Sequence, residues 1–139
     1  MTEIYFYSGA ADKLQVACRL CAKALSHGTR MMIFSADTSV LKKLDILLWT
    51  FQPTSFLPHC CIDDEKLVES TPIILSTRVL AGSDCDVLIN LHDQCPPALE
   101  QFKRVIEIAG FSAEDKSAAR ERYRFYQQTG YELHHHKLA

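Results

Sequence analysis

The chain has 139 residues, of which 47% are hydrophobic and 23% charged, and its formal net charge is −2. This length is typical of one domain, over residues 1–139, that can bury a core without disulfides or a metal. The net charge argues against broad binding to nucleic-acid backbone, which usually requires a basic face. The first residues lack the basic and apolar segments of a signal peptide, and no apolar run reaches the ~18 residues of a membrane span, so we expect a cytoplasmic protein without a membrane partner.

Hydrophobic patterning predicts strands and helices that alternate along the chain. In chain order we expect a strand over 3–7, a helix over 10–26, a strand over 30–35, a helix over 38–50, an irregular stretch over 51–59, strands over 72–76 and 86–91, a short helix over 96–102, a strand over 104–108 and a last helix over 112–128. Continuous apolar strands separated by helices imply a mainly parallel five-stranded sheet that is covered on both faces. The predicted fold is therefore a three-layer α/β/α fold of Rossmann-like type.

This fold class raises the question of nucleotide binding, because α/β proteins bind ligands at the carboxyl ends of their strands. The loop after the first strand, residues 7–13, has a single glycine and lacks both the Gly-x-Gly-x-x-Gly pattern and the Gly-Lys-Ser/Thr phosphate loop. We therefore expect an ordinary turn at Ser8-Gly9. His92 follows the fourth strand, but no nucleophile, base and acid occur in a catalytic pattern. The alternative that this pattern leaves open is an enzyme that binds a small molecule or nucleotide near Ser8-Gly9 and His92.

The cysteines and clustered histidines give no convincing metal motif. Cys18 and Cys21 lie within the first predicted helix, where free cysteines pack as small apolar side chains. His59-Cys60-Cys61 would need Cys18 and Cys21 as a second ligand pair, and nothing local supports that pairing. His134-His135-His136 fit a native tail or the remnant of a tag. We therefore expect no metal and no cofactor.

The last predicted helix carries a basic and aromatic ridge. Lys116, Arg120 and Arg124 are spaced four residues apart and share one stripe, which Tyr123 borders. The apolar residues expected on the other side are Ala118, Ala119, Phe125 and Tyr126. A solvated basic face is the usual outcome for such a run, but Arg offers a bidentate fork for a carboxylate and Tyr an apolar wall. The ridge therefore also suits an acidic peptide that ends in an aromatic residue, whereas three or four cations neutralise too few phosphates for tight DNA binding.

The only tryptophan marks a second candidate surface. Trp49 and Ile46 fall off the inner stripe of the second predicted helix, so at least one of them should be exposed. Exposed aromatic side chains beside the proline-containing stretch 51–59 indicate a protein interface. Coverage of the sheet edge is an equally good interpretation of Trp49 from its pattern alone.

Several motifs, in order along essentially the whole chain, resemble the chi subunit family of bacterial DNA polymerase III, an accessory protein of the clamp-loader complex. The most specific motifs are Leu48-Trp49, Phe56-Leu57-Pro58-His59 and Ala119-Arg120-Glu121-Arg122-Tyr123. The resemblance implies a protein with no catalytic activity of its own.

The resemblance also implies two partners. The chain would bridge the psi subunit of the clamp loader to the C-terminal tail of single-stranded-DNA-binding protein, which is acidic and ends in Pro-Phe with a free carboxylate. The positions that match the family's tail-binding site are Lys116, Arg120, Tyr123 and Arg124. Trp49 and Phe56 match the psi-facing surface. The small pair Ala109-Gly110 stands where relatives carry bulkier residues, which predicts a shallow tail pocket.

Overall fold

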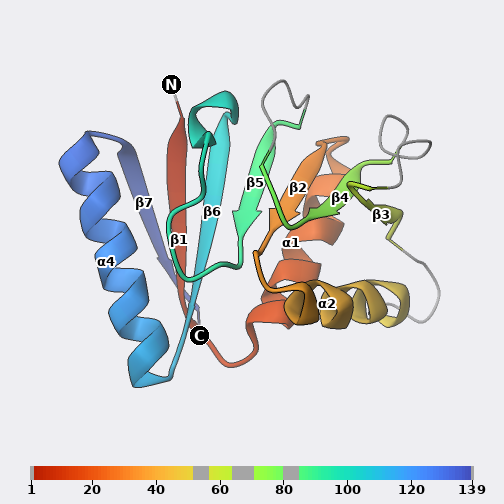
Figure 1. Cartoon of the computed structure of the whole chain (residues 1–139), viewed down its shortest axis with the longest axis horizontal. Helices are drawn as coiled ribbons and strands as arrows, with labels where there is room; N and C mark the ends of the chain where they lie inside the picture. Colours follow the sequence, from red (N-terminus) through yellow and green to blue (C-terminus); the bar gives the residue numbers. More distant parts are fainter. Residues whose placement is uncertain (1, 52–56, 64–70, 80–84, 139) are drawn as a thin grey trace.

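The computed structural model describes residues 2–51, 57–63, 71–79 and 85–138. Strands and helices alternate toward both ends of the chain, as the apolar patterning predicts, whereas three strands follow one another in the middle with no helix between them among the described residues (Figure 1). In order, the elements are β1 (Glu3–Ala10), α1 (Lys13–Ser26), β2 (Met31–Phe34), α2 (Thr38–Thr50), β3 (His59–Cys61), β4 (Ile73–Ser76), β5 (Val87–Asn90), a 3-10 helix (Leu99–Gln101), β6 (Arg104–Gly110), α4 (Ala113–Thr129) and β7 (Glu132–Lys137). The helix predicted over 96–102 is reduced to one 3-10 turn, because Ala98 takes a left-handed conformation (φ 53°) just before it.

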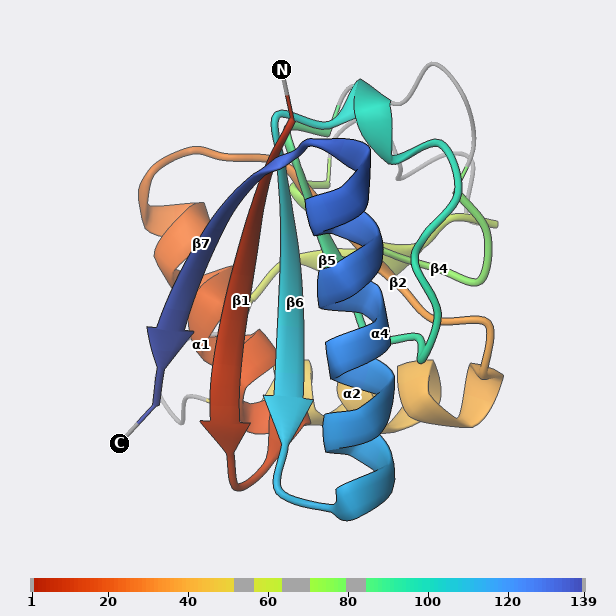
Figure 2. The same cartoon turned by 90° about the vertical axis from the view of Figure 1, so that its left-hand side faces the viewer.

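The strands form one sheet in the order β3-β4-β2-β5-β6-β1-β7, and each pairing within it is parallel. Helices α1 and α2 lie on one face of this sheet and α4 lies on the other (Figure 2). The three-layer α/β/α architecture with a mainly parallel sheet is therefore confirmed. The prediction of five strands is wrong, because the sheet has seven.

The two strands that the prediction missed are β3 and β7. Strand β3 has three residues, too few to show an alternating pattern. Strand β7 consists mostly of Glu, His and Lys, which are not typical of strands. It is a strand because it pairs with β1 along its whole length, from Glu3↔Glu132 to Ser8↔Lys137. The C-terminal histidines are thus the centre of an edge strand and not a tail.

The core lies in two layers, one on each face of the sheet. Successive residues of a strand point to opposite faces, so Met31 and Ile33 pack beneath α1 and α2, whereas Met32 packs on the α4 side. Cys18 and Cys21 are fully buried in the first layer, which confirms their prediction as core residues.

Helix α4 is capped at both ends. Ser112 Oγ accepts a hydrogen bond from the Asp115 N–H at 3.1 Å, as expected of an N-cap residue. Gly130 ends the helix with a φ of 94°, a left-handed conformation in which a Cβ would be strained. The predicted extent of this helix is confirmed to within a residue at each end.

The buried face of α4 differs from the expected one. The helix buries Ala119, Arg122 and Tyr126, which are spaced by three and four residues, while Phe125 is 47% exposed. The placement of Phe125 on the apolar face is therefore wrong, because the buried stripe passes through Arg122.

None of the helices in the described ranges has both the length and the apolar character needed to cross a bilayer.

Candidate functional site

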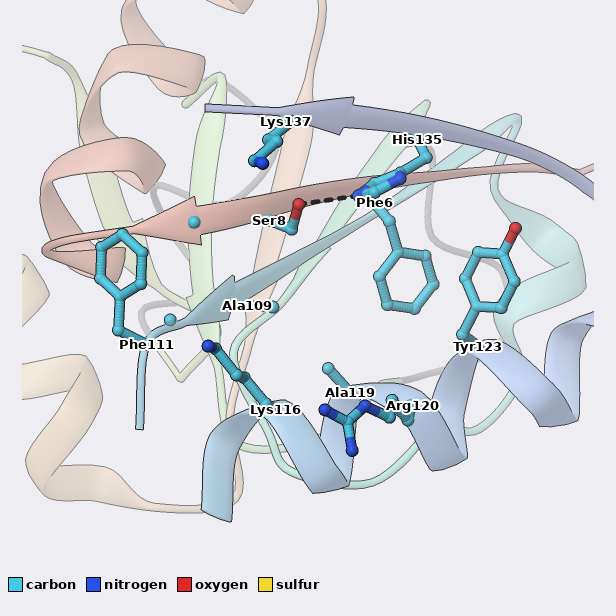
Figure 3. Close-up of a pocket in the computed structure, with 12 residues that line it drawn as sticks. Phe6, Ser8, Ala109, Phe111, Lys116, Ala119, Arg120, Tyr123, His135 and Lys137 are labelled. Atoms are coloured by element: carbon cyan, nitrogen blue, oxygen red, sulfur yellow. Dashed lines mark hydrogen bonds between the residues drawn. The ribbon is translucent and has the colours of Figure 1, made fainter. Parts of the chain in front are cut away.

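A groove runs between α4 and the strands β6, β1 and β7 (Figure 3). It has a volume of about 550 Å³. Its lining residues are Lys116, Ala119, Arg120 and Tyr123 from α4, Phe6, Ser8 and Gly9 from β1, Ala109, Gly110 and Phe111 at the end of β6, and His135 and Lys137 from β7. Because the three strands are parallel, their carboxyl ends meet here, at the edge where α/β folds bind ligands.

The groove is cationic. Lys116 and Arg120 enter it from the helix and Lys137 from β7, and no carboxylate occurs among its described lining residues. Within the described part of the chain, none of these three side chains makes an ion pair, although the Lys116 ammonium lies 6.0 Å from the centre of the Phe111 ring. The arrangement therefore leaves guanidinium and ammonium groups available to an anionic ligand.

The walls of the groove are apolar and aromatic. The rings of Phe6 and Tyr123 meet edge to face with centroids 5.2 Å apart, which joins the helix to the sheet. Phe111 is 62% exposed at the rim. Ala109 and Gly110, which the family resemblance places beside the tail pocket, both line the groove. Phe111, the next residue in the chain, contributes an aromatic ring to the same lining.

A carboxylate near one end of the groove holds the neighbouring elements together. Asp115, in the first turn of α4, accepts a hydrogen bond from Lys13 Nζ at 2.8 Å and another from the Gly110 N–H. Burial opposes ionisation of Asp115, but the hydrogen bonds from Lys13 and Gly110 outweigh it and hold the pKa of this carboxyl below its usual value. Asp115 thus ties α4 to α1 and to the end of β6.

A buried polar network lies beneath the middle of α4. Glu107 on β6 accepts hydrogen bonds from Arg122 Nε at 2.9 Å, Tyr126 Oη at 2.6 Å and Asn90 Nδ2 at 2.9 Å. Burial raises the pKa of Glu107, and the Arg122 guanidinium and the three donors oppose that effect. Arg122 was not predicted to have a separate role, although two sequence signals point to one: it shares a helix face with Ala119 and Tyr126, and Glu107 interrupts an apolar strand.

The structure brings together three of the four residues predicted to bind a peptide tail. Lys116, Arg120 and Tyr123 all line the groove. Arg124 is exposed and does not line it. Four further lining residues were not predicted for this site, because their proximity to α4 depends on the order of strands in the sheet: Phe6, Phe111, His135 and Lys137.

The second candidate surface lies on α2, away from the groove. Trp49 is 53% exposed and Ile46 is 65% exposed, which confirms that at least one leaves the inner stripe. The Trp49 ring lies 4.8 Å from the ring of His59, measured between centroids. Phe56, the other residue predicted for this surface, lies outside the described residues.

His59 joins α2 to the start of β3 beneath this tryptophan. Its side chain is 1% exposed, with Nε2 2.7 Å from Asp45 Oδ1 and Nδ1 2.6 Å from the Leu57 carbonyl oxygen. The imidazole is therefore held on both sides and gives Trp49 a fixed support.

The residues of the alternative enzyme site are not gathered in this groove. Ser8 and Gly9 line it, and Ser8 Oγ is hydrogen-bonded to His135 Nε2 at 2.7 Å. His92 lies elsewhere, against the ring of Phe34 and 3.4 Å from Asp93. The groove therefore does not unite Ser8-Gly9 with His92.

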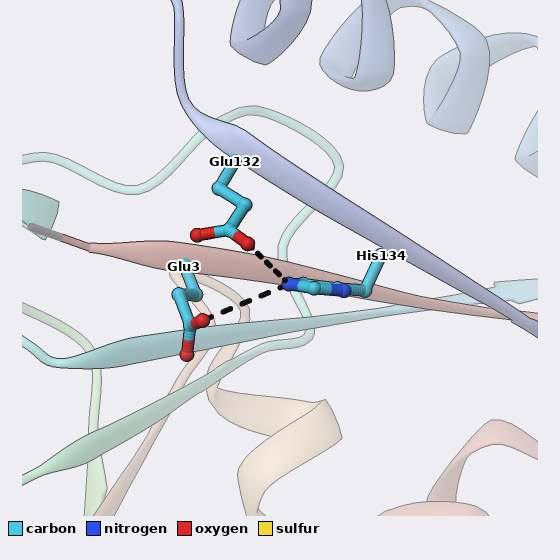
Figure 4. A group of neighbouring side chains, drawn as sticks. All are labelled: Glu3, Glu132 and His134. Atoms are coloured by element: carbon cyan, nitrogen blue, oxygen red, sulfur yellow. Dashed lines mark ion pairs between the residues drawn. The ribbon is translucent and has the colours of Figure 1, made fainter.

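The residues considered as metal ligands in the sequence lie in different parts of the fold. Cys60 packs in the layer on the α4 side, whereas Cys18 and Cys21 pack in the opposite layer, so these cysteines cannot form one site. Within the described ranges, one group of three close-lying candidates occurs, formed by Glu3, Glu132 and His134 (Figure 4). His134 Nε2 lies 3.4 Å from Glu132 and 3.7 Å from Glu3, which are ion-pair distances. We interpret this group as surface ion pairs at the sheet edge.

Comparison with known proteins identifies the family. Residues 1–134 match the family model described as DNA polymerase III chi subunit, HolC. The chain is 34% identical to DNA polymerase III subunit chi of Pseudomonas aeruginosa, over 99% of this chain and 98% of that protein. It is 27% identical to the same subunit of Escherichia coli, over 86% of this chain and 81% of that protein. The chain therefore belongs to the DNA polymerase III chi subunit family, whose members are accessory subunits of a replicative DNA polymerase.

Solved structures show the same fold in an unrelated context. The C-terminal domain of the DEAD-box protein Dbp5 superposes with a TM-score of 0.64 over 99% of this chain and 90% of that chain, at 15% identity. At this identity the likeness shows the fold alone.

Proposed function

We propose that this chain is a non-catalytic adaptor of DNA polymerase III that joins the psi subunit of the clamp loader to the acidic C-terminal tail of single-stranded-DNA-binding protein. One observation carries the proposal: the groove beside α4 combines three cations with aromatic walls, and its described lining contains no carboxylate. That combination fits an acidic peptide ending in an aromatic residue, because the charges and the ring need different surfaces close together.

In this proposal each part of the groove has its own role. The planar guanidinium of Arg120 binds the tail carboxylate or an acidic side chain in bidentate fashion, and Lys116 adds a second charge. Phe6, Tyr123 and Phe111 form the apolar surface for the tail phenylalanine. Arg124 would contact only a peptide that continues past the groove along the exposed face of α4.

The Trp49 surface is the proposed site for psi. A large, exposed aromatic ring with a rigid support is typical of an interface anchor, because little conformational entropy is lost when it is buried. Asp45 and His59 supply that support. Trp49 belongs to α2, on the opposite face of the sheet from α4, so the two partners would not compete for space (Figure 2).

The tail-binding half of the proposal is tested by Arg120→Ala. Loss of a charge-assisted contact costs roughly 1.5–3 kcal/mol, so affinity for a tail peptide should fall about tenfold to hundredfold. Calorimetry measures this with a peptide that carries several acidic residues and ends in Pro-Phe. Affinity should also weaken with added salt, because the pairs are partly exposed.

The matched control is Arg78→Ala, which removes an arginine whose exposed ion pair with Asp63 lies far from the groove in sequence and fold. It should leave the affinity unchanged. A pull-down with full-length single-stranded-DNA-binding protein, with and without its last residues, checks that the tail is the ligand. Unchanged binding by Arg120→Ala would reject the assignment.

A further inference from the structure

Strand β7 forms a second wall of the groove, opposite α4. Alternation along the strand sends His135 and Lys137 into the groove, while His134 and His136 lie on the other face, where they stack on Tyr5 and Tyr7. Figure 3 shows the two walls, with Lys137 and His135 on the sheet side and Arg120 on the helix side. A ligand between them would be contacted from both walls.

This wall is held in place by β1. Ser8 is the register partner of Lys137, its Oγ binds His135 Nε2 at 2.7 Å, and its carbonyl accepts from the Leu138 N–H at 2.8 Å. Gly9 has a φ of 79°, and a Cβ there would come within 3.2 Å of the Leu138 carbonyl oxygen. The backbone on both sides of Lys137 is thus fixed, which limits the positions its ammonium can reach.

The charge of the groove is divided between its walls. Arg120 and Lys116 are on α4, and Lys137 is on β7. One carboxylate bound by Arg120 would occupy the helix side, so the cation on the opposite wall is available to a different carboxylate of the same ligand. A peptide whose single carboxylate is at its terminus would offer Lys137 no carboxylate to bind.

We propose that Lys137 is a specificity-determining residue that binds an acidic side chain of the bound peptide, separate from the carboxylate held by Arg120. His135, fixed by Ser8, positions the peptide against β7. This inference rests on the proposed function, since it assigns a further contact in the same site. With this contact, the site would recognise acidic side chains within the peptide as well as the carboxylate at its end.

The test uses the full chain and two peptides measured by fluorescence anisotropy. The acidic peptide carries aspartates before a terminal Pro-Phe, and the neutral peptide has asparagine at those positions and the same free carboxylate. Lys137→Ala should weaken the acidic peptide about two- to fivefold, as expected for one partly exposed ion pair. It should leave the affinity for the neutral peptide unchanged, whereas Arg120→Ala should weaken both peptides.

Three controls make the result specific. Lys23→Ala removes an exposed lysine of α1, on the opposite face of the sheet, and should change neither affinity. Lys137→Arg keeps the charge and should restore binding of the acidic peptide. Lys137→Glu should weaken the acidic peptide more than Lys137→Ala does.

The outcomes separate the two levels of the proposal. If the wild-type chain binds and Arg120→Ala weakens it, but Lys137→Ala changes nothing, this inference is overturned and the proposed function stands. Equal weakening of both peptides by Lys137→Ala also overturns it, because the lysine would not then recognise an acidic side chain. If the wild-type chain binds neither peptide, the proposed function fails and this inference fails with it.

Discussion

Glu107 lies in the middle of β6 with no exposure to solvent, and Arg122 on α4 is its buried ionic partner. Charges in a protein interior are tolerated when they are paired and hydrogen-bonded. Here Asn90 and Tyr126 satisfy the remaining carboxylate positions, and Arg122 also donates from Nη1 to the Asp93 carbonyl at 2.9 Å. The network holds α4 at one position along the sheet. That position places Arg120, two residues before Arg122, beside the groove.

Arg122→Met should destabilise the protein by about 3–5 kcal/mol, because it leaves an uncompensated buried charge on Glu107. Urea unfolding measures this loss. The double variant Glu107→Gln with Arg122→Met should lose less than the single variant, since the stranded charge is gone. A single variant that unfolds with a free energy within about 1 kcal/mol of wild type would show that the pair is not the main link between α4 and β6.

At the scale of elements, the first turn of α4 is anchored by Asp115. It connects the helix to Lys13 of α1 and to the Gly110 N–H at the end of β6. A Cβ at Gly110 would lie 3.2 Å from the Asp115 carboxylate, so a glycine lets the strand end approach the helix this closely. Phe111 follows Gly110 and Lys116 follows Asp115, so this contact also brings together two residues that line the groove.

Asp115→Asn should lower stability by about 1–2 kcal/mol near neutral pH, through the loss of partly exposed charge-assisted hydrogen bonds. Because the folded-state pKa of Asp115 lies below its unfolded value, the contribution is complete above the ordinary Asp pKa of about 3.9. It is lost as the pH falls through the folded-state pKa. The difference between variant and wild type in urea unfolding should therefore shrink below about pH 4.

Glu114→Gln is the control for this experiment. It removes an exposed carboxylate from the same helical turn. It should change stability little at any of these pH values. A difference for Asp115→Asn that persisted unchanged into acid would contradict the role given to its ionised form.

At the scale of the whole molecule, the sheet separates the two proposed partner surfaces. The groove lies between α4 and the β7 side of the sheet, and the Trp49 surface lies on α2, which packs on the other face. The two surfaces share none of the residues named for either. An adaptor that holds two partners at once requires such a separation.

Trp49→Ala should disrupt co-purification with psi and leave tail binding unchanged. Truncation of an interface anchor typically costs about 2 kcal/mol or more, close to thirtyfold in affinity. Phe125→Ala is the matched control, since Phe125 is a similarly exposed aromatic ring on a different helix. If Trp49→Ala abolished both interactions while its thermal unfolding matched that of wild type, the two surfaces would be coupled and the two-surface adaptor would be wrong.

Local sequence patterns were enough to predict most of the strands and helices, the α/β class, the buried cysteines of α1 and the stripe that carries Lys116 and Arg120. Each of these follows from a local signal, namely the period of apolar residues or the residue that caps a helix. The exposure of at least one of Trp49 and Ile46 followed in the same way from their positions off the inner stripe of α2, and the structure exposes both.

Three features emerged only in the three-dimensional structure: β7 is a strand, Arg122 is buried, and His135 and Lys137 line the same groove as Arg120. These features depend on partners distant in the chain: Ser8 and His135 are 127 residues apart, and Glu107 and Arg122 are 15 apart. An edge strand rich in histidine has no local pattern of its own, because its conformation is stabilised by hydrogen bonds to β1. The α4 wall of the groove can therefore be predicted from the sequence, whereas the β7 wall is formed only when the chain folds.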